Sequence, residues 1–290
     1  MNVLPIITSS LSLFLSQFAC FLNCYLVISI FCLKKSNKRS DFTLIFGRFF
    51  VDIGYTFQTS ANLIYLLINV ISPNSDFLRN SKDLLFFLSW PNYLLGTARA
   101  LLVFFITLDR VLATCLPIYY HKYRSKIPAS FIFSFIFCYV MMENVILFEI
   151  CHYVINVPDE CIHLGCSTNK CFHEDYWMNF EQIMYFSIGV LSIILSVKLF
   201  IWNNCRQKTA KNKDLSRANR LALLDTFIIF FFGFFPPLLF SHVPGVNFET
   251  VGPLSALCKN TGFVIESLII CHVLIWKSRV DPSSSHRTTS

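Results

Sequence analysis

The segment from Thr107 to Tyr120, with the sequence TLDRVLATCLPIYY, decides which fold the chain is expected to adopt. It ends a long, mostly apolar run that begins at Leu84, and the only charged residues of the segment are the adjacent Asp109 and Arg110. A helix needs about 20 mostly apolar residues to cross the roughly 30 Å hydrocarbon layer of a bilayer. We therefore predict a membrane-spanning helix over residues 84–116, with an acid–arginine pair near its end.

The composition of the whole chain indicates a polytopic membrane protein. Of 290 residues, 54% are hydrophobic and 14% are charged, whereas a soluble domain carries about 25% charged residues. A chain this apolar cannot cover a large water-soluble domain with polar side chains, so that class is excluded. We expect an all-α bundle of seven spans in one domain over residues 1–290. The predicted spans are 4–33, 42–71, 84–116, 127–150, 177–202, 221–243 and 251–276.

The loop charges predict the orientation of this bundle. One set of alternate loops, together with residues 277–290, holds sixteen Lys and Arg residues, and the other set holds three. Cytoplasmic loops carry an excess of Lys and Arg. We therefore expect the N-terminus outside and a short cytoplasmic tail at 277–290. The basic residues that give the net charge of +7 thus have a role at the cytoplasmic side of the lipid bilayer. We therefore expect no nucleic-acid partner.

Four of the twelve cysteines lie in or at the edge of the predicted outer loop between the fourth and fifth spans. They are Cys151, Cys161, Cys166 and Cys171. Because an outer loop faces an oxidising compartment, we predict two disulfides there, with all three pairings open. The alternatives are a single bridge, or a bridge to Cys258. A metal site built from these cysteines and nearby histidines is less favoured.

The motifs of common catalytic sites are missing from the sequence. It has no phosphate-binding glycine loop, no Gly-x-Ser-x-Gly and no His-Glu-x-x-His. The predicted loops are also short for a catalytic constellation. We therefore expect no enzyme activity, no catalytic residues, no metal and no cofactor.

The segment quoted above resembles the Asp/Glu-Arg-Tyr motif of rhodopsin-like G-protein-coupled receptors and its continuation into the second inner loop. Asp109-Arg110-Val111 has Val where the family prefers Tyr. Ala113, Pro117 and Tyr120 follow at the family's spacing. The dipeptide alone is equally consistent with a local ion pair at a membrane edge, so the longer match carries the resemblance.

Asn23 in the first span and Asp52 in the second resemble further motifs of that family. The residues around Asp109 and the continuation PIYYHKYR over residues 117–124 look most like the nematode chemosensory serpentine receptors of class BC. The resemblance implies a seven-transmembrane receptor that binds an external small molecule and activates a heterotrimeric G protein. It also implies a plasma-membrane location, with the sensory cilia of neurons as one candidate.

The chain departs from the wider family at several motifs. It has no Cys between Cys32 and Cys115, so the usual tether from the third helix to the second outer loop cannot form. The seventh span lacks Asn-Pro-x-x-Tyr, and the sixth contains Phe234-Phe235-Pro236-Pro237 instead of Cys-Trp-x-Pro. A kink at these prolines would make the sixth span the moving element.

The resemblance implies two functional surfaces. At the inner face, Asp109, Arg110, Pro117 and Tyr120 would engage the G protein. The inner loop adds a basic docking rim consisting of Arg206, Lys208, Lys211, Lys213, Arg217 and Arg220. A topology role beside anionic lipid is the alternative for these basic residues. Candidate ligand-pocket residues in the outer half are Phe57, Trp90, Asn92, Tyr93, Tyr185, Phe234 and Phe235. Plain packing is the alternative for them.

Three charges lie within predicted spans at a similar depth. At 1.5 Å per residue, Asp52, Arg99 and Glu266 each fall roughly 15 Å above the inner face, close to the bilayer midplane. Charges there are costly unless paired. In the family a sodium ion occupies this level, and we infer that the Arg99 guanidinium replaces it between the two acids. In a rival arrangement, Arg48 pairs with Asp52 one helical turn away, and Arg99 pairs with Glu266 alone.

A seven-span channel or transporter is the alternative function. Transporters often contain repeated halves and paired broken helices. The sequence has no visible repeat, and only the sixth span carries such a break, at Pro236-Pro237. These observations favour the receptor.

Overall fold

The computed structural model describes residues 3–32, 43–72, 82–123, 127–158, 161, 164–205, 227–236 and 251–272. All regular secondary structure within these residues is helical. The fold class is therefore all-α, as the sequence predicts.

Six long helices form the body of the structure. They are α1 (Val3–Cys32), α2 (Thr43–Ile71), α4 (Leu84–Cys115), α6 (Ala129–Val145), α7 (Asn179–Cys205) and α11 (Leu254–Cys271). Shorter elements extend or connect them. These are α5 (Pro117–Tyr123), η3 (Ile146–Ile150), η4 (Leu164–Ser167), η5 (Cys171–Met178) and η6 (Ile229–Phe234). The element η6 lies inside the predicted sixth span, of which residues 227–236 are described.

Among the residues that the structure describes, four apolar segments are long enough to cross a bilayer by length and composition. They are Val3–Ser29, Ala129–Ile150, Cys171–Ile201 and Leu254–Cys271. The helices α2 and α4 are also long, with 29 and 32 residues, but both carry buried charged side chains. Such charges are tolerated in a membrane when they face the bundle interior and pair with one another.

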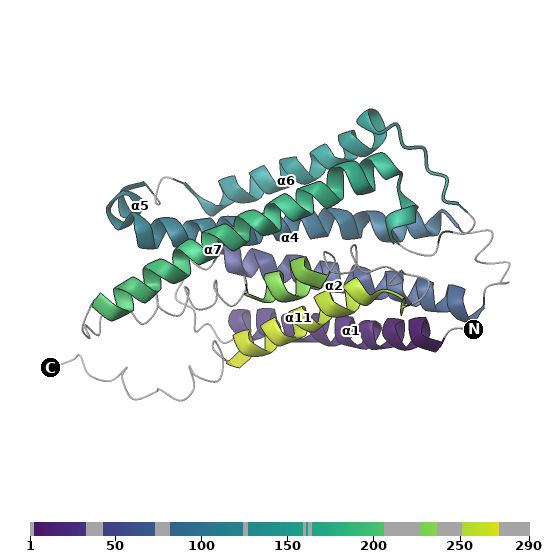
Figure 1. Cartoon of the computed structure of the whole chain (residues 1–290), viewed down its shortest axis with the longest axis horizontal. Helices are drawn as coiled ribbons and strands as arrows, with labels where there is room; N and C mark the ends of the chain where they lie inside the picture. Colours follow the sequence, from purple (N-terminus) through teal and green to yellow (C-terminus); the bar gives the residue numbers. More distant parts are fainter. Residues whose placement is uncertain are drawn as a thin grey trace.

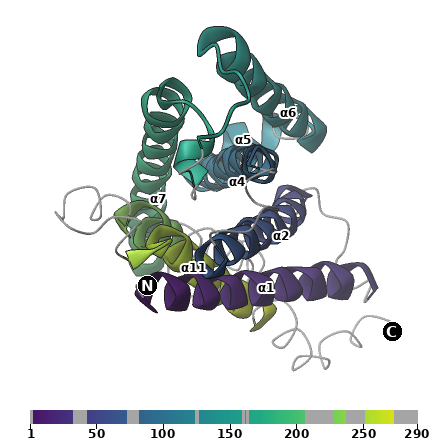
Figure 2. The same cartoon turned by 90° about the vertical axis from the view of Figure 1, so that its right-hand side faces the viewer.

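The helix α4 is central in the bundle. It contacts α2, α6 and α7, whereas α1 packs against α2 and α11, and η6 packs against α11 and α7. Figure 1 labels the long helices, and Figure 2 shows α4 nearly end-on between α2, α6 and α7, with α1 crossing the view below them. Residues on several faces of α4 therefore reach different neighbours. The outward orientation of the N-terminus stays a prediction from the loop charges.

Small polar residues join α1 to its neighbours. Ser16 donates to the Thr56 carbonyl at 2.8 Å, and Asn260 donates to the Ser12 carbonyl at 3.1 Å. Thr8 donates to the Val251 carbonyl at 2.8 Å. Small side chains and interhelical hydrogen bonds are the usual contacts between membrane helices, because lipid removes the hydrophobic driving force for their association.

Candidate functional site

Four charged side chains meet between α2, α4 and α11. Arg99 donates from Nε to Asp52 Oδ1 at 2.8 Å and from Nη2 to Glu266 Oε2 at 3.1 Å. Arg48 Nε lies 3.2 Å from Asp52 Oδ2, and Arg48 Nη2 contacts Glu266 Oε1. No member is more than 5% exposed. Each arginine thus contacts both acids, and we call these four residues the charge ring.

The charge ring combines the predicted bridge from Arg99 to both acids with the Arg48–Asp52 pair of the rival arrangement, in which Arg99 would have contacted Glu266 alone. Arg99 bridges Asp52 and Glu266, and Arg48 also pairs with Asp52 along α2. Two cations and two anions leave the ring without net charge. This balance matters because a buried charge without a partner costs several kcal/mol. The Arg99 guanidinium additionally lies 4.3 Å from the ring centroid of Phe263 on α11.

The Asp109-Arg110 pair lies near the end of α4 and is mostly buried. Arg110 Nη2 is 3.5 Å from Asp109 Oδ2, and Arg110 is 4% exposed. Tyr120, on α5, donates to Asp109 Oδ1 and Oδ2, each at 3.2 Å. Pro117 begins α5 at a helix position where its missing N–H costs nothing. The structure thus brings Asp109, Arg110 and Tyr120 together.

The other predicted G-protein residues are placed differently. Pro117 is exposed, as expected of a residue at the start of a surface helix. The basic rim lies outside the described residues, and this applies to Arg206, Lys208, Lys211, Lys213, Arg217 and Arg220.

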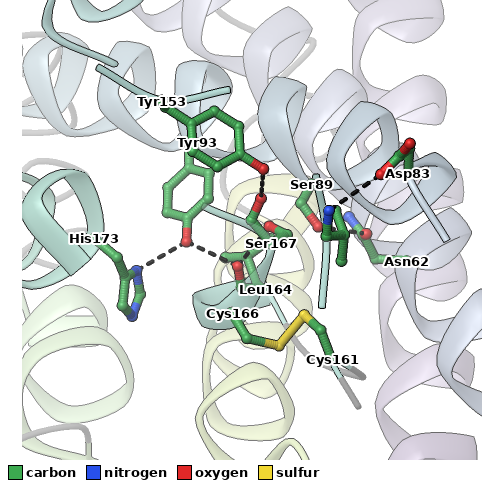
Figure 3. Close-up of a disulfide and its surroundings, with 11 residues drawn as sticks. Asn62, Asp83, Ser89, Tyr93, Tyr153, Cys161, Leu164, Cys166, Ser167 and His173 are labelled. Atoms are coloured by element: carbon green, nitrogen blue, oxygen red, sulfur yellow. Dashed lines mark hydrogen bonds between the residues drawn. A yellow bond between two sulfur atoms is a disulfide. The ribbon is translucent and has the colours of Figure 1, made fainter. Parts of the chain in front are cut away.

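The predicted outer loop contains two disulfides. Cys151 is bonded to Cys171, and Cys161 to Cys166. The thiol of Cys258 is free. Figure 3 shows the Cys161–Cys166 bridge beside the η4 turn.

Hydrogen bonds fix this loop over the bundle. Tyr153 donates to the Ser167 carbonyl at 2.7 Å, and the Val157 amide donates to Asp83 Oδ1 at 3.1 Å (Figure 3). Burial raises the pKa of Tyr153, although its hydrogen bond with the Asn156 backbone opposes this shift. The phenol therefore stays protonated and available as a donor.

Three predicted pocket residues make hydrogen bonds to other parts of the protein. The Tyr93 hydroxyl donates to the Leu164 carbonyl at 3.1 Å and lies 2.8 Å from His173 Nδ1 (Figure 3). Trp90 donates from Nε1 to Asn144 Oδ1 at 3.1 Å, and Asn92 accepts from Thr59 at 3.1 Å. Their polar atoms are bonded within the protein, which favours the packing role.

Two further predicted pocket residues are exposed and do not line the cavity described next. Phe57 is 67% exposed and Phe235 is 43% exposed. A lipid-facing aromatic residue and a pocket-lining one have the same sequence signal. The side chain of Phe234 lies outside the described part of the chain.

Tyr185 does line a cavity, the one toward which α2, α4, α7 and α11 converge. The cavity is narrow and partly open to solvent, with a free volume of about 20 Å³, which is room for about one water molecule. Its lining consists of Tyr55, Gly96, Arg99, Trp177, Glu181, Tyr185, Ile228, Phe232, Gly233, Lys259 and Phe263. Arg99 is therefore shared between this cavity and the charge ring.

The cavity also contains an ion pair that the sequence reasoning missed. Lys259 on α11 donates to Glu181 Oε1 on α7 at 2.7 Å, and Tyr185 donates to the same oxygen at 2.8 Å. Lys259 Nζ lies 5.7 Å from the centre of the Trp177 ring. A signal was present, since both charges fall inside predicted apolar spans.

A buried acid on α6 was missed as well. Glu143 on α6 is fully buried, and its Oε1 accepts a hydrogen bond from Thr97 on α4 at 2.7 Å. It too is a charged residue inside a predicted span. Its place on α6 suits a structural link between α4 and α6.

An all-α bundle of long apolar helices, with charged side chains paired in its interior, defines a polytopic membrane protein. The family model described as serpentine type 7TM GPCR chemoreceptor Srbc matches residues 1–278. The chain belongs to this family, and the resemblance inferred from its motifs is confirmed. A comparison with curated proteins finds no match.

Proposed function

We propose that this chain is a chemosensory receptor that binds an external small molecule and activates a heterotrimeric G protein at the plasma membrane. Membership in a chemoreceptor family supports the receptor class over an enzyme. The observation that carries the proposal is the Asp109–Arg110 pair near the end of α4, with Tyr120 bonded to the acid. In this arrangement the buried guanidinium of Arg110 is held by Asp109, and it becomes available when that contact opens.

The inner-face step depends on the competition for Asp109. Tyr120 and Arg110 both contact the same carboxylate, at 3.2 and 3.5 Å. When helices move, Arg110 leaves Asp109 and its fork donates to the G protein, because charge-assisted hydrogen bonds are stronger than neutral ones. Pro117, Tyr120 and the basic segment 206–220 form the surface around that contact.

The charge ring is the proposed switch between the ligand and the inner face. It joins α2, α4 and α11 through Arg99, which provides the positive charge that the neighbouring acids Asp52 and Glu266 need. Arg99 also lines the cavity, so movements of the helices around the cavity reach a member of the ring. Interfaces of this kind change between discrete arrangements. The sixth span, which contains Pro236, would move with α11, since η6 packs on α11.

The test uses cells that express the full chain with a promiscuous G protein and receive a panel of secreted small molecules. The Arg110→Ala variant should lose signalling while its surface amount stays unchanged. Lys198→Ala is the matched control, because it also removes a cation, at an exposed position on α7. Normal signalling by Arg110→Ala would contradict the coupling role.

The same protein, purified and reconstituted, separates the receptor from the channel or transporter. A receptor should catalyse nucleotide exchange on a purified G protein when an active compound from the panel is added. Ion currents through a bilayer that contains the purified chain alone would instead favour the alternative.

A further inference from the structure

A mostly buried ion pair ties α7 to α11. Lys259 on α11 donates to Glu181 Oε1 on α7 at 2.7 Å, and the Tyr185 hydroxyl donates to the same oxygen at 2.8 Å. The two charged side chains are only 14% and 18% exposed, so water and salt screen their attraction weakly. The charge ring joins α2, α4 and α11, and this pair adds a link from α11 to α7.

The pair has little room to open while the helices stay in place. The cavity beside it has a free volume of about 20 Å³, room for about one water molecule. Lys259 Nζ also lies 5.7 Å from the centre of the Trp177 ring, which adds a cation–π attraction. If the ammonium left Glu181 inside this space, both charges would be buried without a partner, which is costly. The pair therefore opens only when α7 and α11 move apart.

The described part of the sixth span packs on both helices that the pair joins. The element η6 contacts α11 and α7, and Ile228 and Phe232 line the same cavity as the pair. Gly262 lies about one helical turn after Lys259 on α11. A Cβ at Gly262 would lie only 2.8 Å from Phe232 Cβ and 3.0 Å from Ile228 Cγ2. The segment therefore lies directly against α11, and it follows α11 when that helix moves relative to α7.

The α7 side of the pair is continuous with the predicted outer loop. The apolar helical segment Cys171–Ile201 contains both η5 and Glu181, and it begins at the Cys151–Cys171 disulfide. Trp177 lies about one turn before Glu181 and stacks on His173 of the same segment, with ring centroids 5.9 Å apart. A displacement of the loop is therefore passed along η5 to Glu181.

We propose that Lys259 and Glu181 form a clasp that keeps the receptor inactive, by holding α11 and the sixth span against α7 until the outer loop moves. This inference rests on the proposed receptor function and adds a regulatory contact to it, separate from the charge ring and from the Asp109–Arg110 pair. When the clasp opens, α11 and the sixth span move away from α7, and the inner face becomes accessible to the G protein. The mechanism requires no ligand inside the narrow cavity.

The test measures nucleotide exchange on a purified G protein by the purified full chain in lipid nanodiscs, with no compound added. The neutral variant combines Lys259→Met with Glu181→Gln, which removes both charges and leaves Tyr185 an acceptor. Replacing a buried pair by uncharged residues of similar size is often neutral for stability, so this variant should fold. We expect its ligand-free exchange to rise at least about fivefold, the lower end of the usual coupling between two sites. Exchange at the native rate would overturn the inference.

Three further variants separate the clasp from a merely structural ion pair. Glu181→Gln alone is a milder change and should raise ligand-free exchange in the same direction. The reversed pair, Lys259→Glu with Glu181→Lys, restores the attraction between α7 and α11 and should return exchange to near the native rate. The matched control, Lys170→Met with Glu174→Gln, makes the same substitutions in a pair that is 77% and 54% exposed and joins no two helices. It should leave exchange unchanged. Loss of thermal stability in both Glu181 variants without a rise in exchange would indicate a structural pair and overturn the clasp.

Hydrogen–deuterium exchange of backbone amides gives a second readout, which does not depend on the G protein. In the neutral variant the amides of residues 227–236 should exchange several-fold faster than in the native chain, because an open clasp frees this segment from α7. Peptides from α1 and α2, which the clasp does not join, are the control and should exchange at the native rate. A structural pair would instead speed up exchange throughout the bundle. An unchanged rate over residues 227–236 would overturn the inference.

The clasp and the receptor function fail in different ways. Faster amide exchange over residues 227–236, without nucleotide exchange on any G protein by any variant, would leave the contact standing and remove the receptor function. Compound-driven nucleotide exchange by the native chain, with native ligand-free exchange in the neutral variant, would leave the receptor standing and remove the clasp.

Discussion

Tyr120, on the short helix α5, donates a hydrogen bond to both carboxylate oxygens of Asp109 on α4, at 3.2 Å each. The same carboxylate lies 3.5 Å from the Arg110 guanidinium. Two donors from different helices therefore share one acid. The position of α5 thus affects how strongly Asp109 holds Arg110.

We expect Tyr120→Phe and Asp109→Asn to change signalling in opposite directions. Without the Tyr120 hydroxyl, Asp109 can turn fully to Arg110, so ligand-stimulated nucleotide exchange should fall by roughly fivefold, equivalent to one hydrogen bond. Asp109→Asn weakens the hold on Arg110 and should raise exchange in the absence of ligand. Both are measured on purified chain with purified G protein. A fall in both variants would indicate a structural role for the acid.

We expect the stability of the chain to depend on the balance of positive and negative charges in the charge ring. Arg99→Met leaves two acids and one arginine and should destabilise the chain by about 3–5 kcal/mol, with loss of surface expression. Adding Asp52→Asn restores neutrality around the remaining Arg48–Glu266 contact. The double variant should therefore be more stable than Arg99→Met alone. Thermal unfolding of the purified variants measures this difference, and additive losses would contradict the coupling within the ring.

The two disulfides should contribute unequally to stability. Cys151–Cys171 closes a loop with a sequence separation of 20, whereas Cys161–Cys166 has a separation of 5. Loop-closure entropy grows with the logarithm of loop length, which favours the longer loop by about 1 kcal/mol. Replacing Cys151 and Cys171 by Ser should thus lower the unfolding temperature more than replacing Cys161 and Cys166. Mass spectrometry of non-reduced peptides checks the pairing itself, and free thiols at these four positions would contradict it.

The membrane class and the charge ring are accessible from the sequence for one physical reason. A charged residue in an apolar span is costly, so each such residue points to a partner at the same depth. Counting 1.5 Å per residue places Asp52, Arg99 and Glu266 together. It cannot determine that Arg48 contacts Glu266 as well, because that contact depends on how α2 is rotated against α11.

The cavity is only partly accessible from the sequence. Glu181 and Lys259 carry the same signal as Arg99, but their pairing requires knowing that α7 and α11 approach each other at that level. The residue type and depth of Trp90 and Tyr93 predict a pocket role. In the structure Phe172 packs on both, with ring centroids 5.1 and 5.5 Å away. This packing depends on the path of a disulfide-bonded loop. Helical periodicity in the sequence does not predict that path.

The last prediction concerns the contact between α1 and the segment that precedes α11. Gly252 has φ = +80°, which side chains with a Cβ rarely adopt. A Cβ there would lie 2.5 Å from Thr8 Oγ1 and 2.9 Å from Pro5 Cα, and the Pro5 backbone cannot easily move away. Thr8 also donates to the Val251 carbonyl, so displacement would weaken that bond.

Gly252→Ala should therefore destabilise the chain by at least about 1–2 kcal/mol, the usual cost of left-handed backbone for a residue with a Cβ. Gly189→Ala is the control, because it adds the same methyl group in the middle of α7, where the described chain has no neighbouring atom within 4 Å. That change should be neutral or stabilising by up to about 1 kcal/mol, since Ala favours a helix over Gly. Thermal unfolding in nanodiscs compares the two variants. Equal stability would mean that α1 does not pack on this turn, and the closure of the bundle between α1 and α11 would then need revision.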